Sequence, residues 1–258
     1  MISPQAIIEE GAVIGPGCVI EANAFIAKDA KLGSGCIIKQ GARILGNTTL
    51  GENCTIYSYA VLGEVPQDLS YHGEESFLVL GPNCRVREFA TINSGSSKGD
   101  NYTKIGANAF IMAYSHIAHD CILGQNVILA NAATLAGHVQ IGDYSVIGGM
   151  TPVHQFARIG DFCMLAGASA LSQDLPHYCL AEGNRATVRS LNLVGLRRHL
   201  EKDDIAALSE AFRLIFRNET GPGLMSKAAK ELLQSPLGAN SYVARLCSFI
   251  LETKRGIA

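Results

Sequence analysis

Four of the seven histidines gather in one stretch of the chain: His116, His119, His138 and His154. Imidazole changes its protonation near neutral pH, so such a group suits general acid-base catalysis. Asp120 directly follows His119 and could orient that imidazole while it acts as a base. No Ser or Cys lies in a nucleophile-elbow sequence. The pattern therefore favours direct transfer, in which a base removes a proton from a substrate hydroxyl, over a covalent intermediate.

An aliphatic residue at every sixth position organises the first two thirds of the chain. Ile, Leu or Val fills ten such positions from 8 to 62, three from 80 to 92 and, one residue out of phase, twelve from 105 to 171. A period of six matches neither a helix nor a simple strand. It predicts a short strand plus a turn, repeated around a triangular parallel β-helix with three hexapeptides per coil. The aliphatic side chain then points into the prism.

Stacking of these coils brings the histidines together. One coil takes 18 residues, so His119-Asp120 lies under Gly137-His138, which lies under Gln155, beside His154. None of these residues occupies the inward position, and one outer edge of the prism is expected to carry a column of imidazoles. The backbone N–H of Gly137, within that column, could stabilise a developing oxyanion.

Two polar segments, residues 64–77 and 96–103, interrupt the repeat and predict loops that leave the prism, where binding groups are often placed. After residue 175 the repeat ends. Helical patterns follow near Asp203-Asp204, at about 224–233 and at about 241–254. The sequence thus predicts an all-β parallel β-helix domain over residues 1–175 and a C-terminal α-helical domain over residues 176–258.

Composition excludes some classes of protein. The apolar runs are shorter than the ~18 to 20 residues that a membrane span needs, and the first residues resemble no secretory signal, so a cytoplasmic protein is expected. Residues 1–184 carry 9 basic and 16 acidic side chains, whereas residues 185–258 carry 12 and 7. This asymmetry is too weak for nucleic-acid binding. It suits either an ordinary solvated surface or a docking surface for a small acidic protein or a phosphorylated ligand, with Arg213 and Arg217 as candidates for protein docking.

The eight cysteines have the pattern of core residues. Cys18, Cys36 and Cys54 recur at intervals of 18 and share one repeat position with Ala, which indicates small apolar fillers. Close CxxC or CxxH pairs are absent from the sequence, so we expect neither a metal site nor disulfides.

Several linked motifs stand out in the sequence: His116-Ile117-Ala118-His119-Asp120, Leu135-Ala136-Gly137-His138, Val153-His154-Gln155-Phe156, Gly63-Glu64, Gln67-Asp68-Leu69, Gln173-Asp174 with Pro176, and Gly183-Asn184. Together they closely resemble the UDP-N-acetylglucosamine O-acyltransferase family. The resemblance spans essentially the whole chain. It implies left-handed coiling and a homotrimer whose active sites lie between neighbouring prisms. It also implies transfer of a (3-hydroxy)acyl chain from acyl carrier protein to the 3-position of UDP-N-acetylglucosamine, the first step of lipid A biosynthesis, without a metal or other cofactor.

The same resemblance assigns roles residue by residue. His119 matches the general base on the glucosamine 3-hydroxyl, Asp120 its orienting partner and Gly137 the oxyanion donor. The positions that match the family's substrate-contacting residues are Gln67, Asp68, His116, His138, His154, Gln155, Gly167, Asn192, Arg198 and His199. Among them, Asn192, Arg198 and His199 align with the nucleotide and phosphate region, and Gly167 with the position that limits acyl length, where glycine leaves space for a long chain.

Three departures from the family pattern fall in or near the nucleotide-binding positions. This chain has Ser70 where the family commonly has Lys, Val194 where it often has Glu, and His199 where it usually has Arg. The acceptor could therefore be a variant such as the 3-amino analogue.

Other interpretations remain open at this point. A zinc hydratase of the carbonic anhydrase type uses the same kind of prism and would bind zinc through three histidines, but its usual histidine pair is five residues apart, and His116 and His119 are three apart. An ice-binding or structural scaffold would show a regular Thr array rather than histidines and irregular loops. Another acyltransferase of this fold could use acetyl-CoA.

Overall fold

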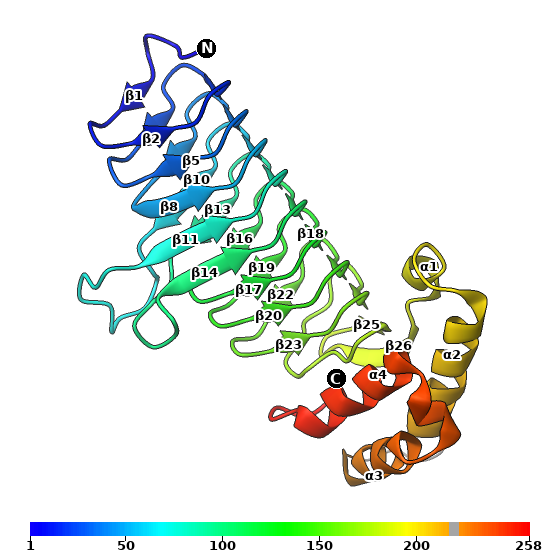
Figure 1. Ribbon diagram of the computed structural model, residues 1–258. Helices are drawn as coiled ribbons and strands as arrows, with labels where there is room; N and C mark the ends of the chain where they lie inside the picture. Colours follow the sequence, from blue (N-terminus) through cyan, green and yellow to red (C-terminus); the bar gives the residue numbers. More distant parts are fainter. Residues whose placement is uncertain (217–221) are drawn as a thin grey trace.

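The chain winds into a three-sided prism that ends in a group of helices (Figure 1). This is a computed structural model, and it describes residues 1–216 and 222–258. Sheet 1 consists of β1 (Ile7–Ile8), β4 (Phe25–Ile26), β7 (Arg43–Ile44), β10 (Val61–Glu64), β13 (Thr91–Asn93), β16 (His116–Ile117), β19 (Thr134–Leu135) and β22 (Pro152–Val153). Sheet 2 consists of β2 (Val13–Ile14), β5 (Lys31–Leu32), β8 (Asn47–Leu50), β11 (Phe77–Leu80), β14 (Tyr102–Ile105), β17 (Ile122–Leu123), β20 (Gln140–Ile141) and β23 (Arg158–Ile159).

Sheet 3 is the longest. It consists of β3 (Val19–Ile20), β6 (Ile37–Ile38), β9 (Thr55–Ile56), β12 (Arg85–Val86), β15 (Phe110–Ile111), β18 (Ile128–Leu129), β21 (Val146–Ile147), β24 (Met164–Leu165), β25 (Cys179–Glu182) and β26 (Thr187–Leu191). All pairings in the prism are parallel except that of β25 with β26. From β1 to β24, successive strands along the chain fall in different sheets, so each coil of the prism contributes one strand to each sheet.

The predicted inward positions form the core of the prism. Ile111, Ile117 and Leu123, from three consecutive strands, are each at most 3% exposed. The cysteine positions behave as expected: all eight thiols are buried and unpaired. The thiol of Cys36 donates to the carbonyl of Gly51 on the next coil (3.2 Å), and that of Cys54 donates in the same way to Gly81 (3.2 Å). The small residues therefore also link adjacent coils at the corners.

Residues 176–192 do not form a helix, contrary to the sequence prediction. They contain the hairpin of β25 and β26, in which β25 pairs with β24 and extends sheet 3. Cys179 and Ala181 face the core with no exposed surface, so this segment continues the burial of the prism without the six-residue pattern. The helical part begins only at residue 193.

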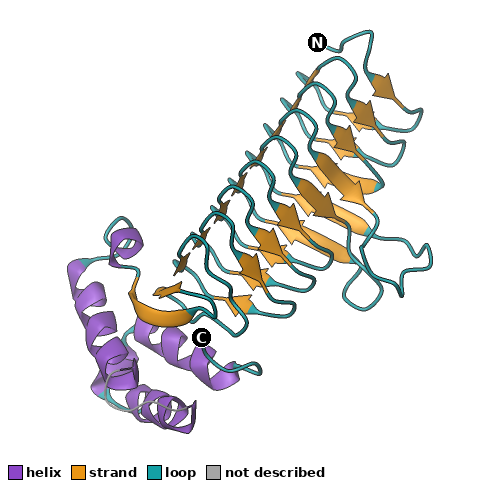
Figure 2. Ribbon diagram, turned by 180° about the vertical axis from the view of Figure 1, so that it is seen from behind, coloured by secondary structure: helices purple, strands orange, loops and turns teal. Residues whose placement is uncertain are grey.

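The C-terminal helices gather at the end of the prism opposite the N-terminus (Figure 2). They are α1 (Leu193–Leu196), α2 (Lys202–Phe216), α3 (Pro222–Leu233), the 3₁₀ helix η1 (Pro236–Ala239) and α4 (Ser241–Glu252). Asp203 and Asp204 lie in the first turn of α2, where their charges favour the helix N-terminus, and not at the cap position. Among the described helices, none has the length and apolar character needed to cross a membrane.

A buried carboxylate joins α4 to the prism. Asp161, at the corner between sheets 2 and 3, accepts a hydrogen bond from the backbone N–H of Asp143 (2.9 Å) and pairs with Arg245 of α4 (2.5 Å). Nδ1 of His177 lies 3.3 Å from Oδ2 of Asp161. Burial tends to raise the pKa of Asp161, but its interactions with His177 and Arg245 outweigh this effect and hold the pKa below its usual value.

We expect Asp161→Asn to destabilise the fold by on the order of 1 kcal/mol at pH 7, because it removes a charge pair whose Arg245 side is largely exposed and screened. Since the folded-state pKa of Asp161 is lowered, its contribution is present above about pH 4 and is lost as the pH falls through the folded value. Thermal unfolding of the variant and wild type from pH 7 to pH 3 measures this. Asp29→Asn, an exposed aspartate outside any helix, is the control. A deficit that stays constant over this pH range would contradict the assignment.

Candidate active site

The corner between sheets 1 and 2 carries the column of rings expected from the 18-residue coil. The backbone N–H of His138 donates to the carbonyl of His119 (3.0 Å), and that of Phe156 donates to Gly137 (3.0 Å). The rings of His119 and His138 meet edge to face at 5.1 Å, and His138 stacks on Phe156 at 4.4 Å. The stacking of His119-Asp120, Gly137-His138 and Gln155-Phe156 predicted from spacing is confirmed.

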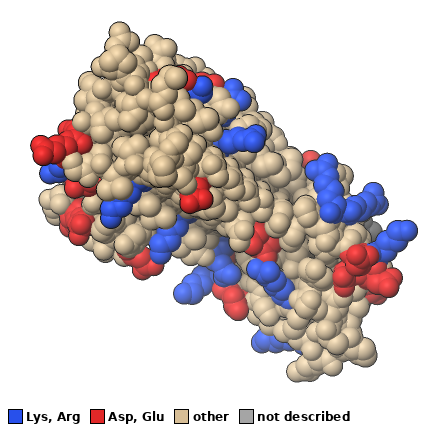
Figure 3. Space-filling model, turned by 45° about the horizontal axis from the view of Figure 1, so that its top comes forward, with Lys and Arg blue, Asp and Glu red and all other residues tan. Residues whose placement is uncertain are grey.

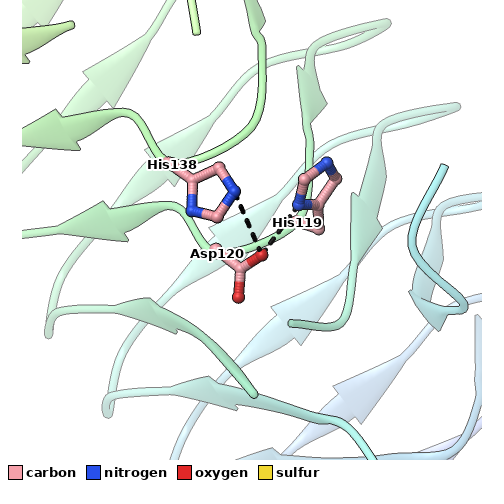
Figure 4. Close-up of side chains that lie close together, drawn as sticks. All are labelled: His119, Asp120 and His138. Carbon is pink, nitrogen blue, oxygen red and sulfur yellow. Dashed lines mark hydrogen bonds and ion pairs between the residues drawn. The ribbon is translucent and has the colours of Figure 1, made fainter. Parts of the chain in front are cut away.

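His119 and Asp120 form a buried pair (Figure 4). Nδ1 of His119 lies 2.8 Å from Oδ2 of Asp120, and each residue is only 6% exposed. An ionised carboxylate can only accept, so Nδ1 carries the proton and Nε2 is left as the basic nitrogen. The pair therefore has the tautomer that a general base requires.

Residues of the second loop also form hydrogen bonds with Asp120. Ser96 donates its backbone N–H to Oδ1 (2.8 Å) and its hydroxyl to Oδ2 (2.6 Å), and the hydroxyl of Thr103 accepts from the backbone N–H of Asp120 (2.9 Å). Burial tends to raise the pKa of Asp120, but the hydrogen bonds from His119 and Ser96 outweigh it and hold the pKa below its usual value. Asp120 thus remains a carboxylate at neutral pH.

Gly137 lies directly against the ring of His119. A Cβ atom at this position would come within 2.6 Å of Cε1 and 2.7 Å of Nε2 of that ring. Among the described residues, no backbone carbonyl accepts a hydrogen bond from the N–H of Gly137. The glycine therefore allows the imidazole to approach the backbone closely and presents an unpaired donor beside it.

Two other histidines of the cluster differ in their surroundings. His138 places Nε2 3.7 Å from Oδ2 of Asp120. Burial lowers the pKa of His138, and the charge of Asp120 opposes this effect only in part. His116 lies on sheet 1, where Nδ1 is 2.7 Å from the hydroxyl of Thr91. Burial, and to a smaller extent His119, also lowers the pKa of His116. Both imidazoles are thereby favoured in the neutral form.

The two predicted loops leave this same corner, on the two coils before His119 (Figure 1), and contact each other. In the first loop, Asp68 accepts from the backbone and hydroxyl of Ser70 (both 2.9 Å). From the second loop, Lys98 pairs with Asp68 at 3.1 Å, and Ser97 donates to Glu74 (3.1 Å). The hydrogen bonds to Ser70 and Lys98 lower the pKa of Asp68. Gln67, beside it, is exposed.

The column continues toward the C-terminus through the exposed His154 and the half-buried Gln155. Nη2 of Arg255, near the end of the chain, lies 3.0 Å from Nδ1 of His154 and also donates to the carbonyl of Ser172 (3.2 Å). A cavity of about 760 Å³ borders Asp120 and His138; its lining also includes Lys104, Phe156, Arg158 and Arg255.

The remaining predicted substrate residues lie at the other two corners of this chain. Gly167 is exposed between sheets 3 and 1, where an added Cβ would make only an ordinary contact of 3.4 Å with Gly149. His199 contacts the rings of Tyr144 and Phe162 between sheets 2 and 3. Asn192 caps α1 by accepting from Gly195 (3.2 Å) and donates to Phe162 (2.9 Å); Arg198 is exposed nearby. One chain therefore does not bring these residues to His119.

His119, Asp120 and His138 are also close enough to bind a metal ion in principle, with candidate ligand atoms within 4.8 Å of one another. However, the carboxylate of Asp120 already accepts three hydrogen bonds, one from His119 and two from Ser96, and a metal bound there would compete with them. The donor set fits a protonated hydrogen-bonded pair better than a metal centre.

Sequence reasoning missed Ser96, Thr103 and Lys98. The interruption of the repeat at residues 96–103 showed that a loop is present, but the pattern could not indicate which side chain turns back to Asp120. The spacing placed His119 on the outside or at a corner of the prism, and it lies at a corner, but the spacing did not indicate that this residue is buried there.

Comparison with known proteins assigns the chain to a family. Residues 174–258 match the family described as Udp N-acetylglucosamine O-acyltransferase, Domain 2, and residues 29–64 and 102–137 match the bacterial transferase hexapeptide repeat. The acyl-[acyl-carrier-protein]–UDP-N-acetylglucosamine O-acyltransferase of Campylobacter concisus is 55% identical, over 99% of this chain and 96% of that protein. That of Campylobacter jejuni subsp. doylei is 58% identical, over 99% and 95%.

Solved structures agree with these relatives. The UDP-N-acetylglucosamine acyltransferase from Campylobacter jejuni has a TM-score of 0.93 at 57% identity and covers 100% of this chain and 98% of that one. The Arabidopsis enzyme of the same name has a TM-score of 0.87 at 35% identity, with 100% of both chains covered. The predicted fold, a left-handed parallel β-helix with a C-terminal helical domain, is confirmed. The names support acyl transfer and neither a zinc hydratase nor an amino-sugar variant. The chain is an acyltransferase and belongs to the UDP-N-acetylglucosamine O-acyltransferase family.

Proposed function

We propose that this enzyme transfers a (3-hydroxy)acyl chain from acyl carrier protein to the 3-hydroxyl of UDP-N-acetylglucosamine, the first step of lipid A biosynthesis. The observation that carries the mechanism is the buried pair of His119 and Asp120, which leaves Nε2 of His119 as the basic nitrogen. The relatives named above bear the name of this reaction.

In the proposed step, Nε2 of His119 removes the proton of the sugar hydroxyl while its oxygen attacks the thioester carbonyl of the donor. The N–H of Gly137 stabilises the negative charge that develops on the carbonyl oxygen. Collapse of the tetrahedral intermediate breaks the carbon–sulfur bond, and the departing thiolate takes the proton from His119. The ester, the free thiol of the carrier and the neutral imidazole are the products, and no metal or other cofactor takes part.

The proposed acceptor site includes Gln67 and Asp68 from the first loop together with His116, His138, His154 and Gln155. All six lie on or next to the corner that carries His119. His116 and His138, which burial favours in the neutral form, can donate to or accept from sugar hydroxyls. This set holds the sugar beside the base.

The proposed nucleotide residues Asn192, Arg198 and His199, and the proposed length-limiting Gly167, require a second copy of the chain. They lie at other corners than His119, so only a neighbouring prism can place them in the same cleft. Apolar surface for such contact exists between sheets 3 and 1, where the partly exposed rings of Tyr59, Phe89 and Tyr114 stack at 5.5 and 5.1 Å. We therefore propose a homotrimer with three sites between prisms. A cytoplasmic enzyme accords with eight unpaired, buried thiols.

A transfer assay tests the reaction. Acyl carrier proteins loaded with chains of several lengths, with and without a 3-hydroxyl, are offered against UDP-N-acetylglucosamine and its 3-amino analogue, and products are identified by mass spectrometry. We expect ester formation on UDP-N-acetylglucosamine with a long 3-hydroxyacyl donor. Transfer only from acetyl-CoA, or no transfer to a sugar nucleotide, would contradict the proposal. Light scattering of the same sample measures whether three chains associate.

Charge reversal at Arg213 is expected to weaken the encounter with acyl carrier protein. Arg213 lies on the exposed side of α2, where it pairs with Glu210 at 2.6 Å, in the part of the chain with a basic excess. Figure 3 shows this surface as basic residues interspersed with acidic ones. Because exposed charges mainly steer association with an acidic partner, Arg213→Glu should raise the KM for the carrier roughly two- to fivefold and reduce its dependence on salt.

The matched control for this change is Lys31→Glu, an exposed reversal on β5 near the other end of the prism. Its KM for the carrier should match that of wild type. Arg217, the second sequence candidate, lies outside the described residues. If reversals throughout the helical part leave both the KM and its salt dependence unchanged, the carrier docks elsewhere.

A further inference from the structure

Hydrogen bonds hold both oxygens of the Asp120 carboxylate in this structure. Its side chain is 3% exposed, Oδ1 is bound by the backbone N–H of Ser96, and Oδ2 is bound by the hydroxyl of Ser96 and by Nδ1 of His119. One residue thus holds both oxygens, at 2.8 and 2.6 Å. Such a two-point contact fixes the plane of the carboxylate, and the hydrogen bond to Nδ1 then fixes the plane of the imidazole.

The loop that carries Ser96 is itself held in place. The carbonyl of Ser96 accepts from the backbone N–H groups of Gly99 and Asn101 (both 3.1 Å), which forms a tight turn around it. The next two residues are joined to the first loop, Ser97 through Glu74 and Lys98 through Asp68. Ser96 is 3% exposed, so its hydroxyl is shielded from water and is committed to Asp120.

We propose that Ser96 is a positioning residue for the base: its backbone and hydroxyl together set the orientation and charge of Asp120, and through Asp120 those of His119. This role rests on the proposed general-base transfer. Ser96 acts on the carboxylate alone and contacts neither the sugar nor the donor in this assignment. Its loss should therefore change the chemical step and leave the affinity for the sugar nucleotide nearly unchanged.

Removal of the Ser96 hydroxyl should change the protonation of His119 in a definite direction. Oδ2 of Asp120 shares its charge between Ser96 and His119, so without the serine hydroxyl more of that charge is directed at the imidazole. The protonated form of the histidine is then favoured, and the base becomes active only at higher pH. A residue with a merely structural role would not move this ionisation.

The kinetic test compares Ser96→Ala with Ser96→Thr, which keeps a hydroxyl, and with Ser34→Ala, on an early coil away from both loops, as the control. For Ser96→Ala we expect a kcat about ten- to a hundredfold lower, a KM for UDP-N-acetylglucosamine within about twofold, and an acid limb of the kcat/KM profile that moves to higher pH. Ser96→Thr should recover most of the rate, and Ser34→Ala should behave as wild type. A raised KM with an unchanged acid limb would overturn the proposal.

Two further measurements keep the inference separate from folding and from the overall reaction. In an Asp120→Asn background, Ser96→Ala should lower kcat little further, because Ser96 acts through the carboxylate that is missing there. Fully additive effects of the two substitutions on kcat would refute this. In protein carrying ¹³Cε1-labelled histidine, the NMR titration midpoint of His119 should move to higher pH in Ser96→Ala. This readout needs no turnover, so it can succeed even if the wild type transfers no acyl group, which would defeat only the proposed function. An unmoved midpoint in a folded variant would defeat the role of Ser96.

Discussion

His119→Ala is expected to lower kcat by at least ~10²- to 10⁴-fold, since it removes the base from the chemical step. Binding of the sugar nucleotide and assembly of the chains should change little, because the Nε2 proton acceptor is needed only when the hydroxyl attacks. Asp120→Asn should be milder, since the imidazole keeps a hydrogen-bond partner but loses the negative charge that stabilises its protonated form. Steady-state kinetics, together with calorimetric titration of UDP-N-acetylglucosamine, measure the two quantities separately.

The matched control is His72→Ala, a histidine on the exposed part of the first loop. It should retain wild-type kinetics. Near-normal kcat in His119→Ala, or an acyl group trapped on a Ser or Cys, would exclude direct general-base transfer from this residue. The base would then have to be sought at His138 or His154.

Gly137→Ala should reduce activity on a similar scale, by about 10²-fold or more, although it adds a single methyl group. The new Cβ would lie 2.6 Å from Cε1 of His119, so the ring would have to move away from the position that Asp120 sets. A displacement of about 1 Å in a reacting group can cost on the order of 10² in rate. The effect should appear in kcat, which steady-state kinetics measure.

Gly223→Ala in α3 serves as the control, because an added Cβ there meets no atom within 4 Å. It should leave both kcat and stability unchanged or slightly improved, as alanine favours a helix. If Gly137→Ala retains wild-type kcat, either the ring tolerates the shift or His119 is not the base; the His119→Ala result separates these two cases.

The repeat made the prism predictable because its physical cause is local and recurs. Each inward aliphatic residue, such as Ile117, is buried by the coils before and after it, so every slot gives the same signal. The stacking of His119 and His138 at one corner followed from the length of one coil, three hexapeptides. The hairpin of residues 179–191 could not be predicted in this way, because it occurs only once, at the end of the stack of coils. Its alternation of buried and exposed residues is also too short to identify two strands from the sequence.

The contacts within the site depend on the loops, where no repeat constrains the chain. Sequence spacing placed His119 at the outside or a corner of the prism, but it did not show that Ser96 binds Asp120 or that both His119 and Asp120 are buried. The orientation of Asp68 was equally hidden, since its partner Lys98 lies 30 residues away on another loop. Such contacts arise from tertiary packing and carry no periodic signature.

The position of the two loops on the prism has a consequence for how this protein can change. Both leave the corner between sheets 1 and 2 on the coils that precede His119, and the chain rejoins the next strand of sheet 2 after each excursion. Residues can thus be added to or removed from a loop tip without altering the winding of the later coils. Deletion of a single hexapeptide within the wall would instead rotate every following side chain by a third of a turn and move Gly137 and His138 to a different edge. The winding of the prism therefore sets no limit on the length of these loops, whereas it does fix the number of residues between His119 and His138.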